Sequence, residues 1–175
     1  MVLNLVPVVQ HVYTCITMHS VKMTNMNNIF NTAASLNSDI ARWDVSNVIN
    51  MGSMFHSAPS FNGDLSKWDV SSVNKMLHMF NTATSFNGDL SEWDVSRVTN
   101  MAHMFYSARS FNGDLSKWDV SAVDSMWGMF YAASSFGQVL YGAWKSSKAT
   151  KNEMFIGSSG RIGTTGMTTP TATES

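Results

Sequence analysis

The sequence predicts an α/β repeat solenoid, a leucine-rich-repeat-like stack of short parallel strands and short helices. Three observations support this fold class. One phrase returns every 25 residues through most of the chain. Within each copy, apolar residues first alternate, as in a strand, and then follow helical spacing. A single copy is too small to enclose its own apolar side chains, so neighbouring copies must cover one another.

The repeat is defined by regularly spaced tryptophans. Trp43, Trp68, Trp93 and Trp118 each open the phrase Trp-Asp-Val-Ser-x-Val. A methionine, a Met-Phe pair, an alanine and a Ser-Phe pair follow at constant distances, and Asn-Gly-Asp-Leu-Ser leads into the next copy. More divergent units come before and after the clear ones. The array is therefore predicted to span residues 21–144, with about five repeats.

The copy that starts at Trp68 shows the expected elements in order. Trp68 and Val70 lie on one side of a short predicted strand, and Lys67 and Asp69 on the other. The next apolar positions have the i, i+3, i+6, i+7, i+10 spacing of one helix face. They are Val73, Met76, Met79, Phe80 and Ala83. The Phe-Asn-Gly segment then turns the chain into the next strand.

Two segments flank the predicted array. Residues 1–20 are expected to form an N-terminal cap. Residues 145–175 are rich in Ser, Thr and Gly and contain little that could be buried, which predicts a flexible tail. We expect a monomer.

Composition excludes several classes of function. The formal net charge is -1 and charged residues make up 13% of the chain, so no basic surface for nucleic acid is expected. Cys15 is the single cysteine, which rules out an intramolecular disulfide and a cysteine-based zinc site. No apolar run is long enough to span a membrane, and no signal peptide is recognised at the start.

The sequence contains no recognisable catalytic machinery. It has neither a Gly-x-Ser-x-Gly elbow nor a phosphate-binding glycine loop, and no Ser/His/Asp arrangement stands out. We therefore predict no catalytic residues, no cofactor, no metal and no enzymatic activity. His78 and His103 share one repeat position, so a metal pair is an alternative to polar surface residues.

The constant columns have structural and functional interpretations. The tryptophans are predicted to be core, with a sugar-binding platform as the alternative, and Trp127 is expected to be partly exposed because it stands alone at its repeat position. The column of Asn37, Asn62, Asn87 and Asn112 is predicted to bond to backbone groups of the adjacent turn. The aspartates of the turns and strands are predicted to bond to nearby backbone, with calcium binding as the alternative.

The long phrase Phe-Asn-Gly-Asp-Leu-Ser-x-Trp-Asp-Val-Ser-x-Val-x-x-Met-x-x-Met-Phe resembles the tandem repeat of BspA-like leucine-rich repeat surface proteins. That family overlaps a domain of unknown function found in bacterial lipoproteins and surface proteins. The resemblance implies a leucine-rich-repeat-like solenoid and a role in adhesion or protein contact. It also implies a cell-surface or secreted location.

The function expected from these observations is a non-enzymatic protein-binding or adhesion module, with a protein or glycan as partner. The alternative is a structural spacer, or a fragment of a larger surface protein, with no ligand of its own. Two surfaces are available. One carries residues that differ between repeats, such as His56, Tyr106 and Tyr131. The other is a charged strip on the outer strand face, formed by Arg42, Asp44, Lys67, Asp69, Glu92, Asp94, Lys117 and Asp119.

Overall fold

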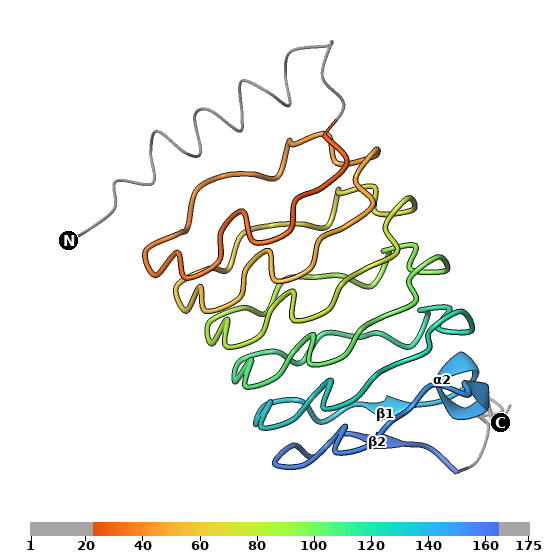
Figure 1. Cartoon of the computed structure of the whole chain (residues 1–175). Coiled ribbons are helices and arrows are strands. Elements are labelled where there is room, and N and C mark those ends of the chain that lie inside the picture. The colour runs from red at the N-terminus through yellow and green to blue at the C-terminus, as the bar shows by residue number, and fades with distance from the viewer. Residues whose placement is uncertain (1–22, 165–175) are drawn as a thin grey trace, which may run out of the picture.

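The chain winds into stacked coils that follow the 25-residue period. A computed structural model describes residues 23–164, so the predicted cap at 1–20 and the residues of the tail from 165 onward lie outside the described part. Figure 1 shows the coils one below another, from the first described residues to the last. We divide the stack into six coils, named first to last in chain order: residues 25–49, 50–74, 75–99, 100–124, 125–149 and the shorter 150–164.

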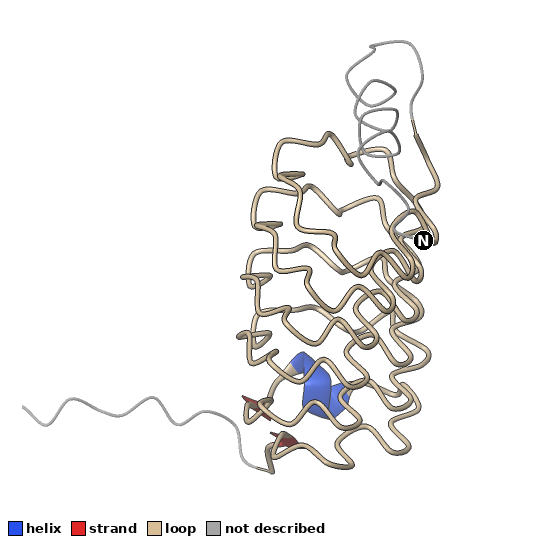
Figure 2. Cartoon of the chain, turned by 90° about the vertical axis from the view of Figure 1, so that its left-hand side faces the viewer, coloured by secondary structure: helices blue, strands red, loops and turns tan. Residues whose placement is uncertain are grey.

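Regular secondary structure is scarce in this stack, as Figure 2 shows. The described elements are strand β1 (Val139–Leu140), helix α2 (Ala143–Ser146) and strand β2 (Arg161–Ile162). β1 and β2 form a parallel pair in which Val139 lies opposite Arg161. The predicted stack of parallel strands and helices is therefore wrong, although the period that suggested it does organise the chain.

The predicted helix at residues 73–83 is replaced by consecutive tight turns. An α-helix needs each backbone N–H to reach the carbonyl four residues earlier. Here Met79 N–H donates to Met76 O at 3.1 Å, whereas His78 N–H donates to Ala102 O of the next coil at 3.0 Å. His78 and Thr82 also have φ values of 57° and 55°, in the left-handed region, which no right-handed helix contains.

The predicted strand at residues 67–70 is also absent. Trp68 N–H donates to Leu65 O at 3.1 Å, and Val73 N–H donates to Val70 O at 2.8 Å. These local turns use the backbone groups that a strand ladder would need. Trp68 and Val70 are nevertheless buried and Asp69 is exposed, because the turns produce the same alternation of sides.

Single parallel bridges and backbone hydrogen bonds join the coils. The bridges link the first residues of successive coils, in the order Asn25, Asn50, Lys75, Asn100, Ser125 and Thr150. Around each bridge, alternate N–H groups of one coil donate to carbonyls of the next. The stack continues beyond residue 144, the end of the predicted array, because Thr150 pairs with Ser125 and both Ala149 and Met154 are buried.

The core consists of ladders of identical side chains that run along the stack. The phenylalanines at the position of the Met-Phe pairs, from Phe30 to Phe155, are spaced 5.5 to 5.6 Å apart between ring centroids. A second ladder from Phe61 to Phe136 has spacings of 5.8 to 6.0 Å. The two ladders touch, as between Phe80 and Phe86 at 4.0 Å. Each coil therefore completes its core with its neighbours.

Candidate binding surfaces

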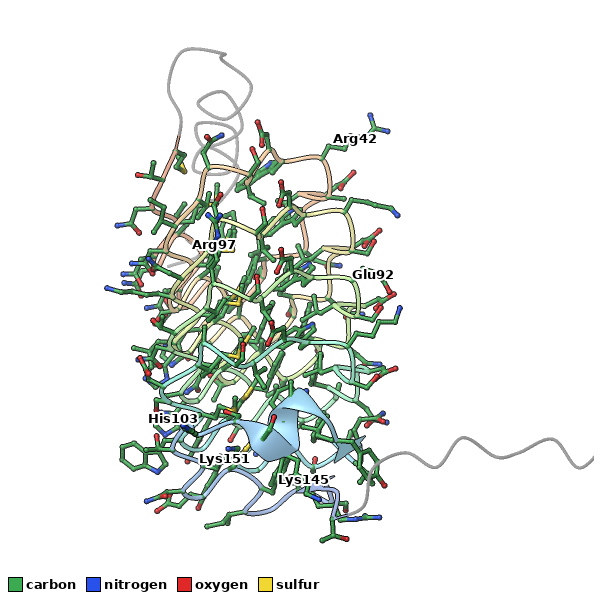
Figure 3. The ribbon with its side chains drawn as sticks, turned by 90° about the vertical axis from the view of Figure 1, so that its right-hand side faces the viewer. Arg42, Glu92, Arg97, His103, Lys145 and Lys151 are labelled. Carbon is green, nitrogen blue, oxygen red and sulfur yellow. The ribbon has the colours of Figure 1, made fainter. Side chains whose placement is uncertain are left out.

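The charged strip predicted from the sequence lies on the outside of the coils. All eight of its residues are exposed. In Figure 3, Arg42 and Glu92 lie at one edge of the molecule and His103 at the opposite edge. Within residues 23–164 the strip contains one ion pair, between Lys117 and Glu92 of adjacent coils. The hydrogen bond that Lys117 Nζ donates to the Glu92 carboxylate raises the pKa of Lys117.

The aspartates of the strip hold local turns. Asp69 Oδ1 accepts the backbone N–H of Ser71 at 3.0 Å, and the corresponding aspartates of the other coils do the same. Hydrogen bonds from the hydroxyl and the backbone N–H of Ser96 lower the pKa of Asp94. The aspartates of the strip therefore contribute part of their hydrogen-bond acceptor capacity to the fold.

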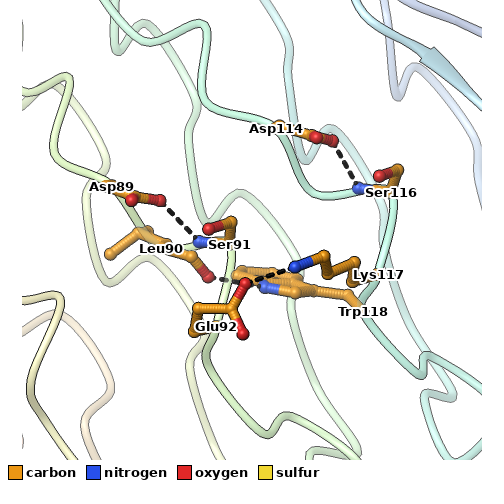
Figure 4. A network of polar contacts seen from close by, with 8 residues as sticks. All are labelled: Asp89, Leu90, Ser91, Glu92, Asp114, Ser116, Lys117 and Trp118. Atoms are coloured by element: carbon orange, nitrogen blue, oxygen red, sulfur yellow. Dashed lines mark hydrogen bonds and ion pairs between the residues drawn. The ribbon is translucent and has the colours of Figure 1, made fainter.

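The second aspartate column has the same local role, as shown in Figure 4. Asp89 Oδ1 accepts Ser91 N–H and Asp114 Oδ1 accepts Ser116 N–H, both at 2.9 Å. No group of three or more His, Cys, Asp or Glu side chains is placed to hold a metal ion in the part of the chain that the structure describes.

The tryptophan column is core, as predicted, and every later indole bonds to the coil before it. Trp68, Trp93 and Trp118 are buried, so they cannot form a sugar platform. Their Nε1–H groups donate to the carbonyls of Ile40, Leu65 and Leu90 at 2.9 to 3.1 Å. Figure 4 shows the bond of Trp118. The predicted asparagine ladder is confirmed from Asn62 onward, since Asn62 Oδ1 accepts Asn87 N–H at 2.9 Å and Asn87 Oδ1 accepts Asn112 N–H at 2.9 Å. Among the described residues, Asn37 Oδ1 makes no such bond to Asn62.

A cluster of imidazole and aromatic side chains lies away from the charged strip, and we call it the aromatic flank. The parallel rings of His78 and His103 are 4.9 Å apart, and the ring of Trp127 is 5.2 Å from His103. Beside them, Tyr106 and Tyr131 stack at 4.8 Å. Trp127 is 48% exposed, as predicted, and the others are half-buried. The flank comprises His56, His78, His103, Tyr106, Trp127 and Tyr131.

Neighbouring residues position the histidines of the flank. Asn81 bonds to the Nδ1 of His78 at 3.0 Å. Gly128 has φ +58° and leaves room for the next ring, because a Cβ there would lie 2.7 Å from His103 Cδ2. Burial lowers the pKa of both His78 and His103, and His103 and His56 lower that of His78 further. A lowered pKa favours the neutral form of both imidazoles, which suits their stacking.

A groove that the sequence did not predict crosses the first coils beside the bridges. It has a volume of about 650 Å³ and is lined by Thr24, Asn47, Ile49, Ser72, Asn74, Arg97 and Thr99. Its hydroxyl and amide groups come from repeat positions that vary between coils. Asn74 Oδ1 is buried there without a hydrogen-bond partner. Composition alone could not reveal this groove, because it depends on which variable side chains become neighbours.

Comparison with known proteins identifies a family but no close relative. Neither the curated proteins nor the solved structures contain a match to this chain. No helix in residues 23–164 is long and apolar enough to cross a membrane. One family model matches the chain twice, over residues 13–96 and 64–163, as expected for tandem repeats. The chain therefore belongs to the family described as Mycoplasma protein of unknown function, DUF285.

Proposed function

We propose that this chain is a non-enzymatic binding module, with a protein or glycan partner, of the BspA-like surface-protein type. The observation that carries the proposal is a division between constant and variable columns. The buried columns repeat nearly the same residue in every coil, whereas several exposed columns change from coil to coil. Stacking of the coils accounts for the residues that stay constant, so we assign partner recognition to the exposed positions that vary.

The aromatic flank is the preferred contact surface. Tyrosine and tryptophan provide large contact areas at little cost in side-chain entropy, and they are enriched at positions that dominate binding energy. Trp127 stands where other coils have Gly52, Leu77 and Ala102, so the scaffold does not require an indole at this position. A large aromatic side chain that is 48% exposed and that the other coils do without is suited to contact a partner.

The charged strip is the second surface. One of its columns is an aspartate in each of the four coils, and the other is Arg42, Lys67, Glu92 and Lys117, so the strip carries both signs of charge. This favours a partner that also carries both signs. Its aspartates already accept hydrogen bonds from their own turns, and Lys117 is paired with Glu92. Exposed ion pairs contribute little to affinity. The strip is therefore expected to affect the rate of association more than the strength of binding.

The experiment uses substitutions that copy the residue of another coil. Trp127→Ala takes the residue found at Ala102, and Tyr106→Asn takes the residue found at Asn81, so both variants should fold. Immobilised wild-type chain is tested against surface proteins and glycan arrays, and each ligand found is titrated by calorimetry. Each substitution is expected to weaken binding about tenfold or more, as for a central aromatic contact.

A matched control addresses the opposite edge. Glu92→Lys reverses one charge of the strip and copies the residue at Lys67. Binding that survives Glu92→Lys but is lost in Trp127→Ala supports the flank, and the reverse pattern assigns recognition to the strip. If no ligand binds to the wild type in either screen, the binding module is rejected in favour of the structural spacer.

A further inference from the structure

The segments that carry the aromatic flank are almost free of charge. Hydrogen bonds join these segments from coil to coil, such as Ser53 N–H to Leu77 O and His78 N–H to Ala102 O. They are residues 27–32, 52–57, 77–82, 102–107, 127–132 and 152–157. Glu153 is the single Asp, Glu, Lys or Arg among them. These segments therefore carry one formal charge, and that charge is negative.

The repeat places Glu153 close to His103. Glu153, Gly128 and His103 occupy one repeat position in successive coils, and their φ values of 57°, 58° and 54° give them the same backbone conformation. Gly128 has no side chain to separate the two others. Burial lowers the pKa of His103, and the carboxylate of Glu153 opposes that shift. Glu153 is exposed and makes no ion pair within residues 23–164, so its carboxylate is available to a cation from outside.

His103 presents a ring nitrogen at the same place. A Cβ on Gly128 would lie 2.9 Å from Nε2 of His103, so Nε2 faces the space beside Gly128. Asn81 bonds to the ring of His78, whereas the equivalent residue beside His103 is Tyr106, whose ring meets the imidazole edge-on. No hydrogen bond within residues 23–164 uses a ring nitrogen of His103. In the neutral tautomer protonated at Nδ1, Nε2 accepts a hydrogen bond from a donor placed there.

Aromatic rings complete the surroundings of Gly128. Trp127 precedes it in the chain, is 48% exposed and has its ring 5.2 Å from that of His103. Tyr131 N–H donates to Gly128 O at 3.1 Å, and the Tyr131 ring stacks on that of Tyr106. The faces of indole and phenol rings attract cations, more often arginine than lysine. One carboxylate, one imidazole nitrogen and exposed aromatic surface therefore meet around Gly128.

We propose that this place binds an arginine side chain of a protein partner, with the guanidinium against the indole of Trp127 and paired with Glu153. Arginine suits it because a planar guanidinium stacks on aromatic rings and has five N–H donors, enough for both the Glu153 carboxylate and His103. A lysine ammonium cannot stack in this way. The proposal rests on the proposed function, since it takes the aromatic flank as the contact surface, and it narrows the partner to a protein with an exposed arginine.

The test compares short peptides that differ in one side chain. The probe is acetyl-Gly-Arg-Gly-amide, and its counterparts carry lysine or citrulline, which keeps the shape of arginine without the charge. NMR follows the indole N–H signals of the six tryptophans in the full chain, and the signal missing from Trp127→Ala identifies Trp127. The arginine peptide should move the Trp127 signal. The citrulline peptide should bind at least about tenfold more weakly, and the lysine peptide should fall between the two.

A matched pair of variants tests the carboxylate. Glu153→Gln keeps the shape and removes the charge, so it should weaken binding of the arginine peptide about tenfold. Glu92→Gln makes the same change on the charged strip and should bind this peptide like the wild type. Circular dichroism shows whether both variants keep the fold.

The outcomes separate this proposal from the proposed function. A Trp127 signal that no peptide moves, equal affinity for the arginine and citrulline peptides, or equal effects of the two glutamine variants would each overturn the arginine site. A neutral glycan as the ligand that depends on Trp127 would overturn it too, while leaving the aromatic flank as the contact surface. The proposed function fails separately, if the ligands found in the protein and glycan screens bind to Trp127→Ala as tightly as to the wild type.

Discussion

Trp93 and Trp43 occupy the same repeat position in an interior coil and in the first described coil. Both are 4% exposed. Trp93 Nε1–H donates to Leu65 O at 3.0 Å, whereas Trp43 Nε1–H has no acceptor. The difference lies in the neighbouring coil and not in the residue or its burial. The stability of this chain therefore resides largely in the interfaces between coils, and a coil with one neighbour should gain less than a coil with two.

The phenylalanine ladder provides the largest test of this comparison. Phe80 is fully buried and stacks on Phe55, Phe86 and Phe105 at 4.0 to 5.5 Å, whereas Phe155 is only partly buried. Phe80→Ala is expected to lower the free energy of unfolding by about 3–5 kcal/mol, because the cavity is enclosed by rings that cannot collapse into it. Urea unfolding followed by fluorescence measures this loss.

Phe155→Ala is the paired measurement at the last coil. It should cost clearly less than Phe80→Ala under conditions where the chain is monomeric, because solvent can enter the space that the ring leaves. Equal losses at the two positions would show that the end coil is as well supported as the interior, contrary to the comparison.

The period and the core could be predicted from the sequence, but the local backbone could not. Val73, Met76, Met79, Phe80 and Ala83 were expected on one helix face, and all of them are buried. A succession of three-residue turns buries the same positions, so apolar spacing alone cannot distinguish the two structures. The feature that distinguishes them is the left-handed backbone at His78 and Thr82. Glycine is the usual sequence signal for such a backbone, and neither residue is a glycine.

Exposed residues of the candidate surfaces could be predicted where a residue could be compared with those at the same repeat position in other coils. Trp127 was expected to be exposed because it replaces smaller residues, and His78 and His103 were expected at one position, where their rings stack. In contrast, the buried Asn74 Oδ1 has no hydrogen-bond partner, and this depends on which residues of other coils surround it. Contacts of that kind require the three-dimensional register.

The tryptophan column provides a second, smaller test. Trp→Phe removes the indole N–H and leaves a similar gap at both positions, so the difference between the two variants isolates the hydrogen bond. Trp93→Phe loses the bond to Leu65 O, while Trp43→Phe loses no bond and removes a buried polar group without an acceptor. Trp93→Phe should therefore cost about 1–2 kcal/mol more than Trp43→Phe in urea unfolding. The reverse order would mean that Trp43 Nε1–H finds an acceptor in solution.

The smallest effect on stability is expected from a change in pH, and it should arise at His78, which has another histidine on each side. His78 lies between His56 and His103, with ring centroids at 6.1 and 4.9 Å, and burial lowers its pKa in the folded state. Since the unfolded chain then takes up protons at higher pH than the folded one, stability is full above about pH 6.5 and declines as pH falls below it. Urea midpoints at a series of pH values measure this decline.

His78→Ser copies Ser53, which has the same left-handed backbone, and so removes the imidazole without introducing a new conformation. Because the substitution removes one lowered pKa and one neighbour of His103, the urea midpoint of the variant should depend less on pH than that of the wild type. Burial also lowers the pKa of His103, but Glu153 opposes that shift, which makes His78 the better choice for substitution. An unchanged pH dependence in His78→Ser would place the titrating group outside the aromatic flank. In that case the stacked imidazoles would be a consequence of the repeat, without a measurable share in its stability.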